Sequence, residues 1–351
     1  MTLNPGDFDR VRCAGGRVKD IAGLLDGPDD PRGPSVVVLG ASGFVGSAVV
    51  AELARLPVRL RAVSRGPVAV PATAEAAVEV RRADLALPGA VADAVEGADA
   101  VVHLAAHIGG AQSWRAADER AERVNVGLAR DLVEACRGHP GTPPAVIFAG
   151  TIQTGSAAAP GPGSYAAQKT AAEEILRAGT ADGAVRGVVL RLATVYGRSP
   201  LSGSTGRGVL SAMAARALGG EPLTMWHDGS VERDFLHVRD AAAAFAAALR
   251  HVPRLQGRPW LVGSGRPERL GDVFTALAGT VAARTGKPAV PVLSVPPPAY
   301  AEAGDFHTPE SDPAAFRAVT GWRAGVPLRE GLDDMVAAMA GAAGAKGEDA
   351  E

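Results

Sequence analysis

Tyr165 and Lys169 stand four residues apart at the start of a segment with helical spacing, so their side chains share one helix face. An ammonium group beside a phenol favours the phenolate, which would bring the tyrosine pKa from about 10 toward neutrality. Thr151 follows an apolar, strand-like segment and carries a hydroxyl suited to hydrogen-bond a carbonyl. The three residues predict a site that exchanges a proton with a carbonyl or hydroxyl. The alternative is an incidental surface pair, although the chain has only four lysines and otherwise uses arginine.

A glycine-rich turn lies upstream, within the sequence SVVVLGASGFVG at 35–46. Residues 36–39 form an apolar, β-branched run that is typical of a buried strand, and helical spacing of apolar residues begins after the turn. Gly40, Gly43 and Gly46 suit a tight turn, a close approach of pyrophosphate to the backbone, and close packing of helix on strand. The turn predicts a dinucleotide site at a helix start, where free N–H groups attract an anion. The alternative is an ordinary turn with no ligand.

The type of dinucleotide is predicted from the end of the second strand-like segment, 58–63. A carboxylate at this place would accept the ribose hydroxyls of NAD, but the chain has Ser64 and Arg65. A hydroxyl and a guanidinium suit the 2′-phosphate of NADP(H), and Arg61 is expected to add to the positive field. The sequence therefore predicts NADP(H). The alternative is that Arg65 is a solvated surface residue.

The candidate residues named so far lie at the ends of predicted strands and helices that alternate along the chain. The predicted strands are 36–39, 58–63, 78–81, 99–105, 144–148 and 187–192, and the predicted helices are 47–55, 89–95, 116–136, 166–177 and 239–250. The alternation predicts an α/β fold with a doubly wound parallel sheet. We expect a dinucleotide-binding domain of 34–197 and 235–254, a smaller substrate-binding lobe of 198–234 and 255–340, a flexible arm of 1–33, and a flexible tail of 341–351.

Composition excludes several classes of protein. The 351 residues have a formal net charge of -2, with 47% hydrophobic and 21% charged residues, as in globular proteins that carry no basic surface for nucleic acid or lipid. The sequence contains no secretory signal and no apolar stretch of membrane-spanning length, so we expect a cytoplasmic protein. Cys13, Cys136 and the scattered histidines predict neither a disulfide framework nor a metal site.

In combination the motifs resemble the extended short-chain dehydrogenase/reductases of the NAD-dependent epimerase/dehydratase family, which act on nucleotide-linked sugars. The resemblance runs from about residue 34 to 340 and rests on the glycine turn, Asp84-Leu85, VVHLAA at 101–106, Asn125, the set Thr151, Tyr165 and Lys169, Arg191 with Tyr196-Gly197, and RDFLHVRD at 233–240. It implies a Rossmann-type sheet and a homodimer, with Tyr165 as the acid/base, Lys169 also on the nicotinamide ribose, and Thr151 orienting the substrate carbonyl. The other cofactor contacts it implies are Gly40, Ser42, Gly43, Phe44, Val45, Gly46, Ser64, Arg65, Asp84, Leu85, Leu104, Ala105, Ala106 and Asn125.

The resemblance also narrows the reaction. The segments 58–66 and 221–229 look like those of the TDP-4-keto-6-deoxyhexose 4-ketoreductases of antibiotic deoxysugar pathways. Ile152-Gln153 stand where sugar 4,6-dehydratases carry acidic residues, which disfavours dehydration. The sequence departs from the family at Ala149-Gly150, where serines are common, and at Thr194, where asparagine is frequent. Two alternatives stay open: a nucleotide-sugar epimerase of the same fold, and a non-catalytic regulator that senses NADP.

Substrate contacts are predicted at His107, Thr151, Arg207, Trp226 and Arg233, with Trp114 as a further contact on the loop of His107. Arg233 would bind the diphosphate, and the alternative is a structural ion pair with Asp234 or Asp240. The alternative for Trp226 is a place in the core. His103 lies inside a predicted strand and is expected to be a packed histidine.

Overall fold

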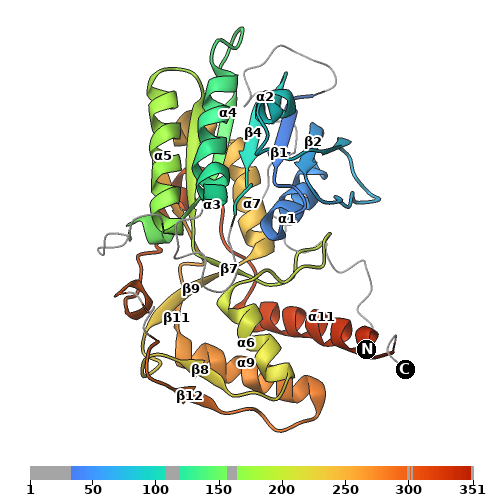
Figure 1. The fold of residues 1–351 in the computed structure, drawn as a ribbon, viewed down its shortest axis with the longest axis vertical. Coiled ribbons are helices and arrows are strands. Elements are labelled where there is room, and N and C mark those ends of the chain that lie inside the picture. Colours follow the sequence, from blue (N-terminus) through green and yellow to red (C-terminus); the bar gives the residue numbers. More distant parts are fainter. Residues whose placement is uncertain (1–32, 108–118, 156–163, 299–300, 302, 349–351) are drawn as a thin grey trace.

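Seven parallel strands form the central sheet of the molecule (Figure 1). The computed structural model describes residues 33–107, 119–155, 164–298, 301 and 303–348. The strand order is β10-β6-β5-β4-β1-β2-β3. The strands are β1 Ser35–Leu39, β2 Arg59–Ser64, β3 Ala77–Arg82, β4 Ala100–His103, β5 Ala145–Thr151, β6 Arg186–Leu192 and β10 Pro259–Val262. The order reverses beside β1, and this confirms the predicted doubly wound sheet.

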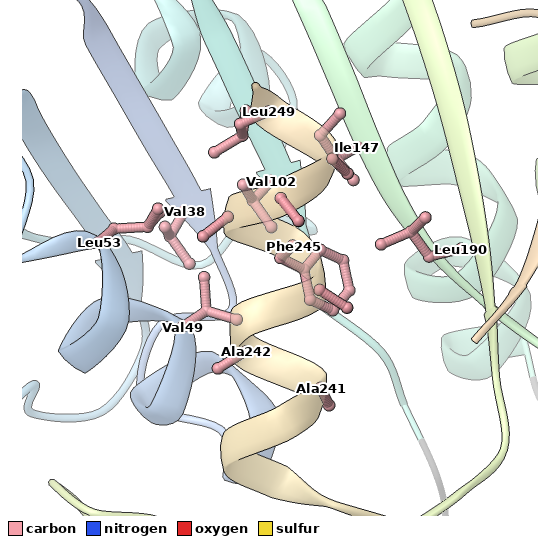
Figure 2. Close-up of a cluster of buried hydrophobic side chains, with 14 of the residues drawn as sticks. Val38, Val49, Leu53, Val102, Ile147, Leu190, Ala241, Ala242, Phe245 and Leu249 are labelled. Atoms are coloured by element: carbon pink, nitrogen blue, oxygen red, sulfur yellow. The ribbon is translucent and has the colours of Figure 1, made fainter. Parts of the chain in front are cut away.

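Helices cover both faces of this sheet, because apolar side chains of each central strand point alternately to either side. One face carries α1 Phe44–Leu53, α7 Val238–Leu249, α8 Val252–Leu255 and α10 Ala314–Thr320. The other carries α2 Ala90–Val95, α3 Glu119–Glu122, the π-helical turn η4 Arg123–Gly127, α4 Leu128–Cys136 and α5 Tyr165–Ala181. The alanine-rich helix α7 lies close against the strands, with Phe245 fully buried among Val102, Ile147 and Leu190 (Figure 2).

A second group of elements lies beyond the carboxyl ends of the strands and has its own apolar core (Figure 1). It contains α6 Val209–Leu218, α9 Leu270–Thr285 and α11 Leu328–Glu348, with the short sheets β11 Pro267–Arg269, β9 Glu232–His237 and β7 Thr194–Tyr196, and β12 Val292–Ser294 and β8 Leu223–Met225. Two 3-10 turns, η5 Ile152–Gly155 and η6 Ala303–Phe306, complete the described elements. Strand β9 runs directly into α7 and thereby links this lobe to the main sheet.

Three parts of the chain differ from the sequence prediction. The segment Pro259–Val262 was expected in the smaller lobe, but it is the edge strand of the main sheet, where Trp260 is buried. Helix α11 continues to Glu348, so 341–348 of the segment expected as a tail belong to a helix. The predicted helix 116–136 contains the π-helical turn η4. Nearly all of the predicted arm 1–33 lies outside the described residues. Within the described part of the chain, no helix is long and apolar enough to cross a bilayer.

Candidate functional site

The glycine turn joins the ends of three neighbouring strands. Gly40 has a φ of +88°, and its N–H donates to the Val63 carbonyl of β2 at 2.9 Å. A Cβ on Gly40 would lie 2.7 Å from the Ala105 nitrogen, just after β4. A Cβ on Gly46 would overlap the Gly40 carbonyl oxygen. The turn therefore excludes side chains at Gly40 and Gly46, and the backbone stays open at the sheet edge.

Helix α1 begins directly after this turn. Its N-cap is Gly43, which has no side chain to accept from the first turn, so the N–H groups of Phe44, Val45 and Gly46 have no partner within the helix. Ser42 stands immediately before this start. A close backbone with free N–H groups at a helix start fits the pyrophosphate of a dinucleotide.

Ser47 ties α1 to a segment that precedes α6. Its Oγ lies 2.6 Å from the Ser199 Oγ and 2.8 Å from the Ser202 Oγ, and it donates to the Gly43 carbonyl at 2.8 Å. A cavity of about 390 Å³ lies beside this contact and is lined by Ser42, Ser47, Pro67, Val68, Ala69 and Ser202. The sequence prediction missed this hydroxyl cluster, because nothing in the local pattern links residues about 150 positions apart.

The end of β2 carries positive charge and lacks a carboxylate. Ser64 is buried and its Oγ donates to the Gly66 carbonyl at 2.6 Å, while Arg65 is exposed. The strand register places Arg82 of β3 opposite Ser64. Among the described residues, the exposed guanidinium groups of Arg65 and Arg82 have neither an acidic partner nor a hydrogen bond. Arg82 was not predicted as a cofactor residue, because its position opposite Ser64 depends on the register of β3 on β2, which the sequence alone does not reveal.

Arg61 does not join this positive group. Its guanidinium pairs with Glu79 at 2.8 Å and donates to the carbonyls of Ala94 and Glu96, both at 3.0 Å. It is thus held against the end of α2, and the expectation that it adds to the field at the end of β2 is wrong.

Other predicted cofactor residues lie at the same carboxyl edge of the sheet. After β3, the Asp84 carboxylate accepts from the Ala86 N–H at 3.1 Å and Leu85 is buried. After β4, the Leu104 N–H donates to the Leu39 carbonyl of β1 at 2.9 Å, followed by Ala105 and the exposed Ala106. These contacts shape the loops that border the glycine turn.

Asn125 lies in the π-helical turn η4 and is fully buried. Its amide pairs with the backbone of His107, accepting from the N–H at 2.8 Å and donating to the carbonyl at 2.9 Å. Its second amide hydrogen goes to the Gln168 Oε1 at 2.7 Å. Both of its donors are therefore used inside the protein, and Asn125 holds the loop after β4 against the helix that carries Lys169.

Lys169 is buried beneath Tyr165 on helix α5. Its Nζ donates to the Ala149 carbonyl of β5 at 2.9 Å and lies 4.5 Å from the Phe148 ring centroid and 5.5 Å from the Tyr165 ring centroid. Burial lowers the Lys169 pKa to about 8, and the neighbouring charge of Glu173 opposes this shift. Because Ala149 is two residues before Thr151, the Lys169 bond ties the Tyr165 helix to the Thr151 strand.

The pKa of Tyr165 differs from the sequence expectation. Burial of the phenol raises this pKa above its ordinary value, whereas the sequence analysis expected the ammonium of Lys169 to lower it. The loss of solvation outweighs the ammonium, whose charge is 5.5 Å from the ring centroid. Tyr165 is therefore held as a neutral phenol that can donate a proton.

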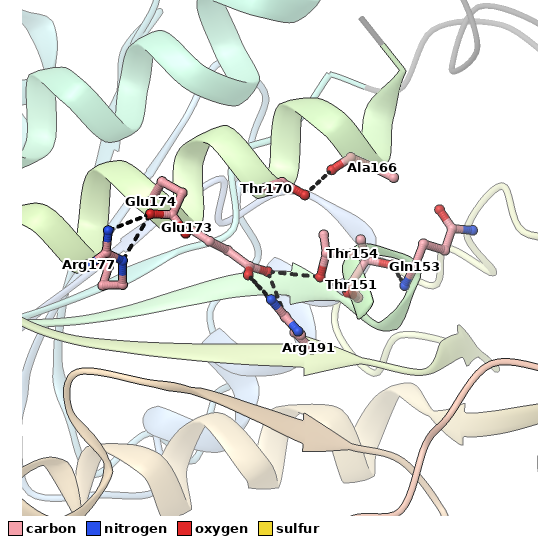
Figure 3. A network of polar contacts seen from close by, with 9 residues as sticks. All are labelled: Thr151, Gln153, Thr154, Ala166, Thr170, Glu173, Glu174, Arg177 and Arg191. Atoms are coloured by element: carbon pink, nitrogen blue, oxygen red, sulfur yellow. Dashed lines mark hydrogen bonds and ion pairs between the residues drawn. The ribbon is translucent and has the colours of Figure 1, made fainter. Parts of the chain in front are cut away.

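A network of polar contacts lies next to this site (Figure 3). The Glu173 carboxylate binds the Arg191 guanidinium of β6 through contacts of 2.7 and 3.0 Å, and Thr154 Oγ1 lies 3.4 Å from it. Thr154 Oγ1 donates to the Thr151 carbonyl at 2.8 Å, and the Thr151 Oγ1 accepts from the Gln153 N–H at 3.3 Å. The end of β5 is thus fixed on both sides of Thr151. Sequence reasoning named Arg191 as a motif residue but missed Glu173.

Arg233 binds backbone carbonyls and not the acidic residues of the alternative interpretation. Its guanidinium donates to the carbonyls of Asp305 and His307, at 2.9 and 2.6 Å, so it binds the backbone around η6. Asp234 instead accepts from the N–H groups of Ser264 and Gly265, at 2.7 and 2.9 Å. Asp240 likewise accepts from two backbone N–H groups, of residues 325 and 326. The proposed ion pair of Arg233 with Asp234 or Asp240 is therefore wrong.

The remaining predicted substrate residues are spread over the second lobe and one loop. Trp226 is half-buried after β8 and does not belong to the core, and Arg207 is exposed just before α6. His107 is half-buried at the end of a described segment, whereas Trp114 lies outside the described residues. Thr194, the departure from the family pattern, is half-buried at the start of β7.

Two histidines are buried, His103 beside the site and His237 at the junction of β9 and α7. His103 in β4 stands edge-on to Phe148, with ring centroids 5.3 Å apart. Its pKa is lowered to about 3, mainly by burial and to a smaller extent by the positive charge of Lys169. His237, at the N-cap of α7, has a pKa lowered to about 4 by burial and Arg239. Within the described chain, both His103 ring nitrogens lack a hydrogen-bond partner. The expectation of a packed histidine in a strand is confirmed for His103.

Comparison with known proteins adds independent evidence. Residues 36–263 match the model of the NAD dependent epimerase/dehydratase family. The chain is 33% identical over 218 residues to the 2'-dehydrokanamycin reductase of Streptomyces kanamyceticus, a match that spans 61% of this chain and 57% of that protein. It is 30% identical over 237 residues to the dTDP-6-deoxy-L-talose 4-dehydrogenase (NAD(P)(+)) of Kitasatospora kifunensis. This match spans 62% of this chain and 71% of that protein.

Solved structures agree on the fold. The structure of MoeE5 in complex with UDP-glucuronic acid and NAD superposes with a TM-score of 0.68 at 28% identity, over 88% of this chain and 100% of that one. The match extends well beyond the seven-stranded sheet and includes most of the second lobe.

Proposed function

Since this chain belongs to the NAD dependent epimerase/dehydratase family, we propose that it is an NADPH-dependent reductase of the C4 ketone of a TDP-linked 4-keto-6-deoxyhexose. One observation carries the proposal: the buried Lys169 ammonium lies 5.5 Å from the Tyr165 ring centroid and binds the carbonyl of Ala149, two residues before the Thr151 hydroxyl, at the edge that holds the glycine turn. This is the set that reduction of a ketone requires, because the product alkoxide needs a proton and its precursor needs a polarising hydrogen bond.

Each residue has a role in the proposed reaction. NADPH, when bound on the glycine turn, supplies the hydride that reduces the ketone. Thr151 donates its hydroxyl hydrogen bond to the carbonyl oxygen, and Tyr165 gives that oxygen its phenolic proton. Lys169 stabilises the phenolate that remains, since its ammonium is held in place by the Ala149 carbonyl. Asn125 supports this arrangement from a distance, through the His107 backbone and Gln168.

The choice of NADPH is supported by charge. Arg65 and Arg82 extend from neighbouring strands at the end of β2, and neither has an acidic partner among the described residues. Two such guanidinium groups can bind a 2′-phosphate, whereas NAD would leave them unpaired. The relative from Kitasatospora kifunensis carries NAD(P)(+) in its name, which is consistent with either cofactor.

The substrate class is supported by the relatives. The protein from Kitasatospora kifunensis is named for the 4-position of a dTDP-linked 6-deoxyhexose, and the one from Streptomyces kanamyceticus is named as a reductase. In this proposal the sugar lies between Thr151 and His107, and its nucleotide extends toward Arg207, Trp226 and Arg233. The proposal also includes the homodimer that the resemblance implies. Light scattering tests it by measuring the molar mass of the protein in solution.

The direct test is a panel of TDP-4-keto-6-deoxyhexoses of D and L configuration, mixed with protein and NADPH. We expect loss of absorbance at the reduced-nicotinamide band for at least one sugar. We expect Tyr165→Phe to lower this turnover by about 10²- to 10⁴-fold while NADPH still binds, because only the proton donor is lost. No turnover across the whole panel would overturn the proposal.

An epimerase is the second candidate, because the matched family includes epimerases by its description. It predicts that the purified protein retains NAD and interconverts sugar isomers without net use of cofactor. Product analysis separates the two candidates, since only a reductase consumes NADPH in proportion to product. A non-catalytic sensor of NADP predicts no turnover that depends on Tyr165.

A further inference from the structure

Glu173 is a buried carboxylate that the proposed reaction does not use. It lies on α5 one helical turn after Lys169, which itself lies one turn after Tyr165, so the three side chains follow one helix face. The Glu173 residue is only 6% exposed. A charge in such a place is costly to bury unless it is paired, so its partners identify its role.

Its partners come from each element that forms the site. Arg191 of β6 binds the carboxylate through both Nε and an Nη atom, at 3.0 and 2.7 Å from Oε2. Thr154, in the turn after Thr151, reaches Oε1 at 3.4 Å (Figure 3). Lys169 interacts with it through charge, from the preceding turn of the helix. Glu173 therefore connects the helix of Tyr165 to β6 and to the turn that follows β5.

Gly150 provides the space for this carboxylate. A Cβ on Gly150 would lie 2.6 Å from the Glu173 Oε1 and 3.3 Å from the Arg191 Cγ. The glycine has an ordinary strand conformation, so space and not backbone freedom requires it. The Glu173 carboxylate that packs over Gly150 thus explains why the chain has glycine where the family commonly has serine.

We propose that Glu173 is a positioning residue that keeps Lys169 as an ammonium beneath Tyr165, with Arg191 fixing the carboxylate and Gly150 making room for it. This inference rests on the proposed function for its catalytic meaning, because Lys169 matters only where Tyr165 transfers a proton.

The charged and titratable groups around Lys169 determine whether its side chain is protonated. Tyr165 and Glu173 face it from α5, His103 from β4, and Arg191 from β6 through Glu173. Tyr165 and His103 are neutral when buried, and Arg191 is positive. Burial raises the Glu173 pKa, but the hydrogen bonds and charge of Arg191 oppose that rise and favour the carboxylate, so Glu173 is the negative charge in this group that supports the ammonium against the loss of solvation.

The test is a direct titration of Lys169 in the variant Glu173→Gln. The chain has only four lysines, so ¹³C-lysine labelling gives a simple NMR spectrum, in which Lys169→Arg identifies the Lys169 signal. We expect Glu173→Gln to lower the Lys169 pKa by about one unit or more, because a nearby negative charge is removed from a poorly solvated site. An unchanged Lys169 pKa would overturn the inference.

The neighbouring residue provides a matched control. Glu174 is exposed and pairs with Arg177 at 2.7 Å on the outer side of the same helix. Glu174→Gln removes the same charge one residue away and should leave the Lys169 signal where it is. An equal shift in both variants would mean that charge anywhere on this helix, and not the buried carboxylate in particular, sets the lysine pKa.

A second variant covers the case in which Glu173→Gln does not fold. Gly150→Ala keeps every charge but displaces the carboxylate, so it should lower the Lys169 pKa in the same direction by a smaller amount. The titration needs neither sugar nor NADPH. A lysine shift without turnover on any sugar therefore contradicts the proposed function alone, whereas turnover without a shift contradicts the role of Glu173.

Discussion

At the scale of single residues, Tyr165 and Lys169 have pKa values moved in opposite directions by the same loss of solvation. The phenol keeps its proton and the ammonium gives up its proton more readily, so the pair is set to donate a proton at neutral pH. The phenol is therefore protonated at neutral pH.

Lys169 gives the proposed reaction an alkaline limit. The side chain is a cation below its pKa of about 8 and neutral above it, and only the cation stabilises the phenolate. We expect kcat/KM to fall about tenfold per pH unit above this value. In Lys169→Arg the limit should move beyond the measurable range, since a guanidinium stays charged. The same alkaline limit in Lys169→Arg would assign it to another group.

Arg65 and Arg82 are expected to decide between NADPH and NADH. Replacing either by glutamine should raise the KM for NADPH by about tenfold or more and leave the KM for NADH nearly unchanged, because each loses a charge-assisted bond to the 2′-phosphate. Arg61→Gln is the matched control, since Arg61 is bound to Glu79 and the end of α2. Equal effects on both cofactors would contradict the assignment.

At the scale of elements, η4 and the loop after β4 form one unit through Asn125. Asn125→Ala removes the amide that binds the His107 backbone and the Gln168 side chain. We expect the free energy of unfolding to fall by about 2–4 kcal/mol, measured by chemical denaturation, because three hydrogen bonds are lost and each contributes about 0.5–1.5 kcal/mol. A loss below about 1 kcal/mol would mean that water replaces the amide.

The order of elements could be predicted from the sequence, and the contacts between distant elements could not. Apolar runs such as 36–39 and the turn that follows them report on their own neighbourhood, so the glycine turn and the Tyr165–Lys169 pair were found directly. Strand β10 was missed because its four residues lie among loops and prolines. Glu173 and Ser47 were missed because their roles depend on Arg191 and Ser199, which only the fold brings near.

At the scale of the whole molecule, buried histidines predict sensitivity to acid. The pKa values of His103 and His237 fall to about 3 and 4, whereas both are near 6.5 in the unfolded chain. Between those limits the unfolded chain binds more protons, so stability falls as pH decreases from about 6.5. The cost from His103 alone should reach roughly 3 kcal/mol by pH 4.

Denaturation curves at pH 7 and pH 4.5 check this expectation. His103→Leu should reduce the difference in unfolding free energy between the two pH values, because the group that gains the proton is gone. His251→Gln serves as the control, since His251 is half-buried at the end of α7. An unreduced pH difference in His103→Leu would place the acid sensitivity in other groups.

The π-helical turn η4 also constrains how this chain tolerates insertion and deletion. A π-helical turn is equivalent to one surplus residue in an α-helix, and each residue of an α-helix accounts for a rotation of about 100°. Deleting a single residue between Asn125 and α4 would restore regular winding and turn the Asn125 side chain about the helix axis. Its amide would then no longer meet the His107 backbone, so we expect this turn not to tolerate that deletion.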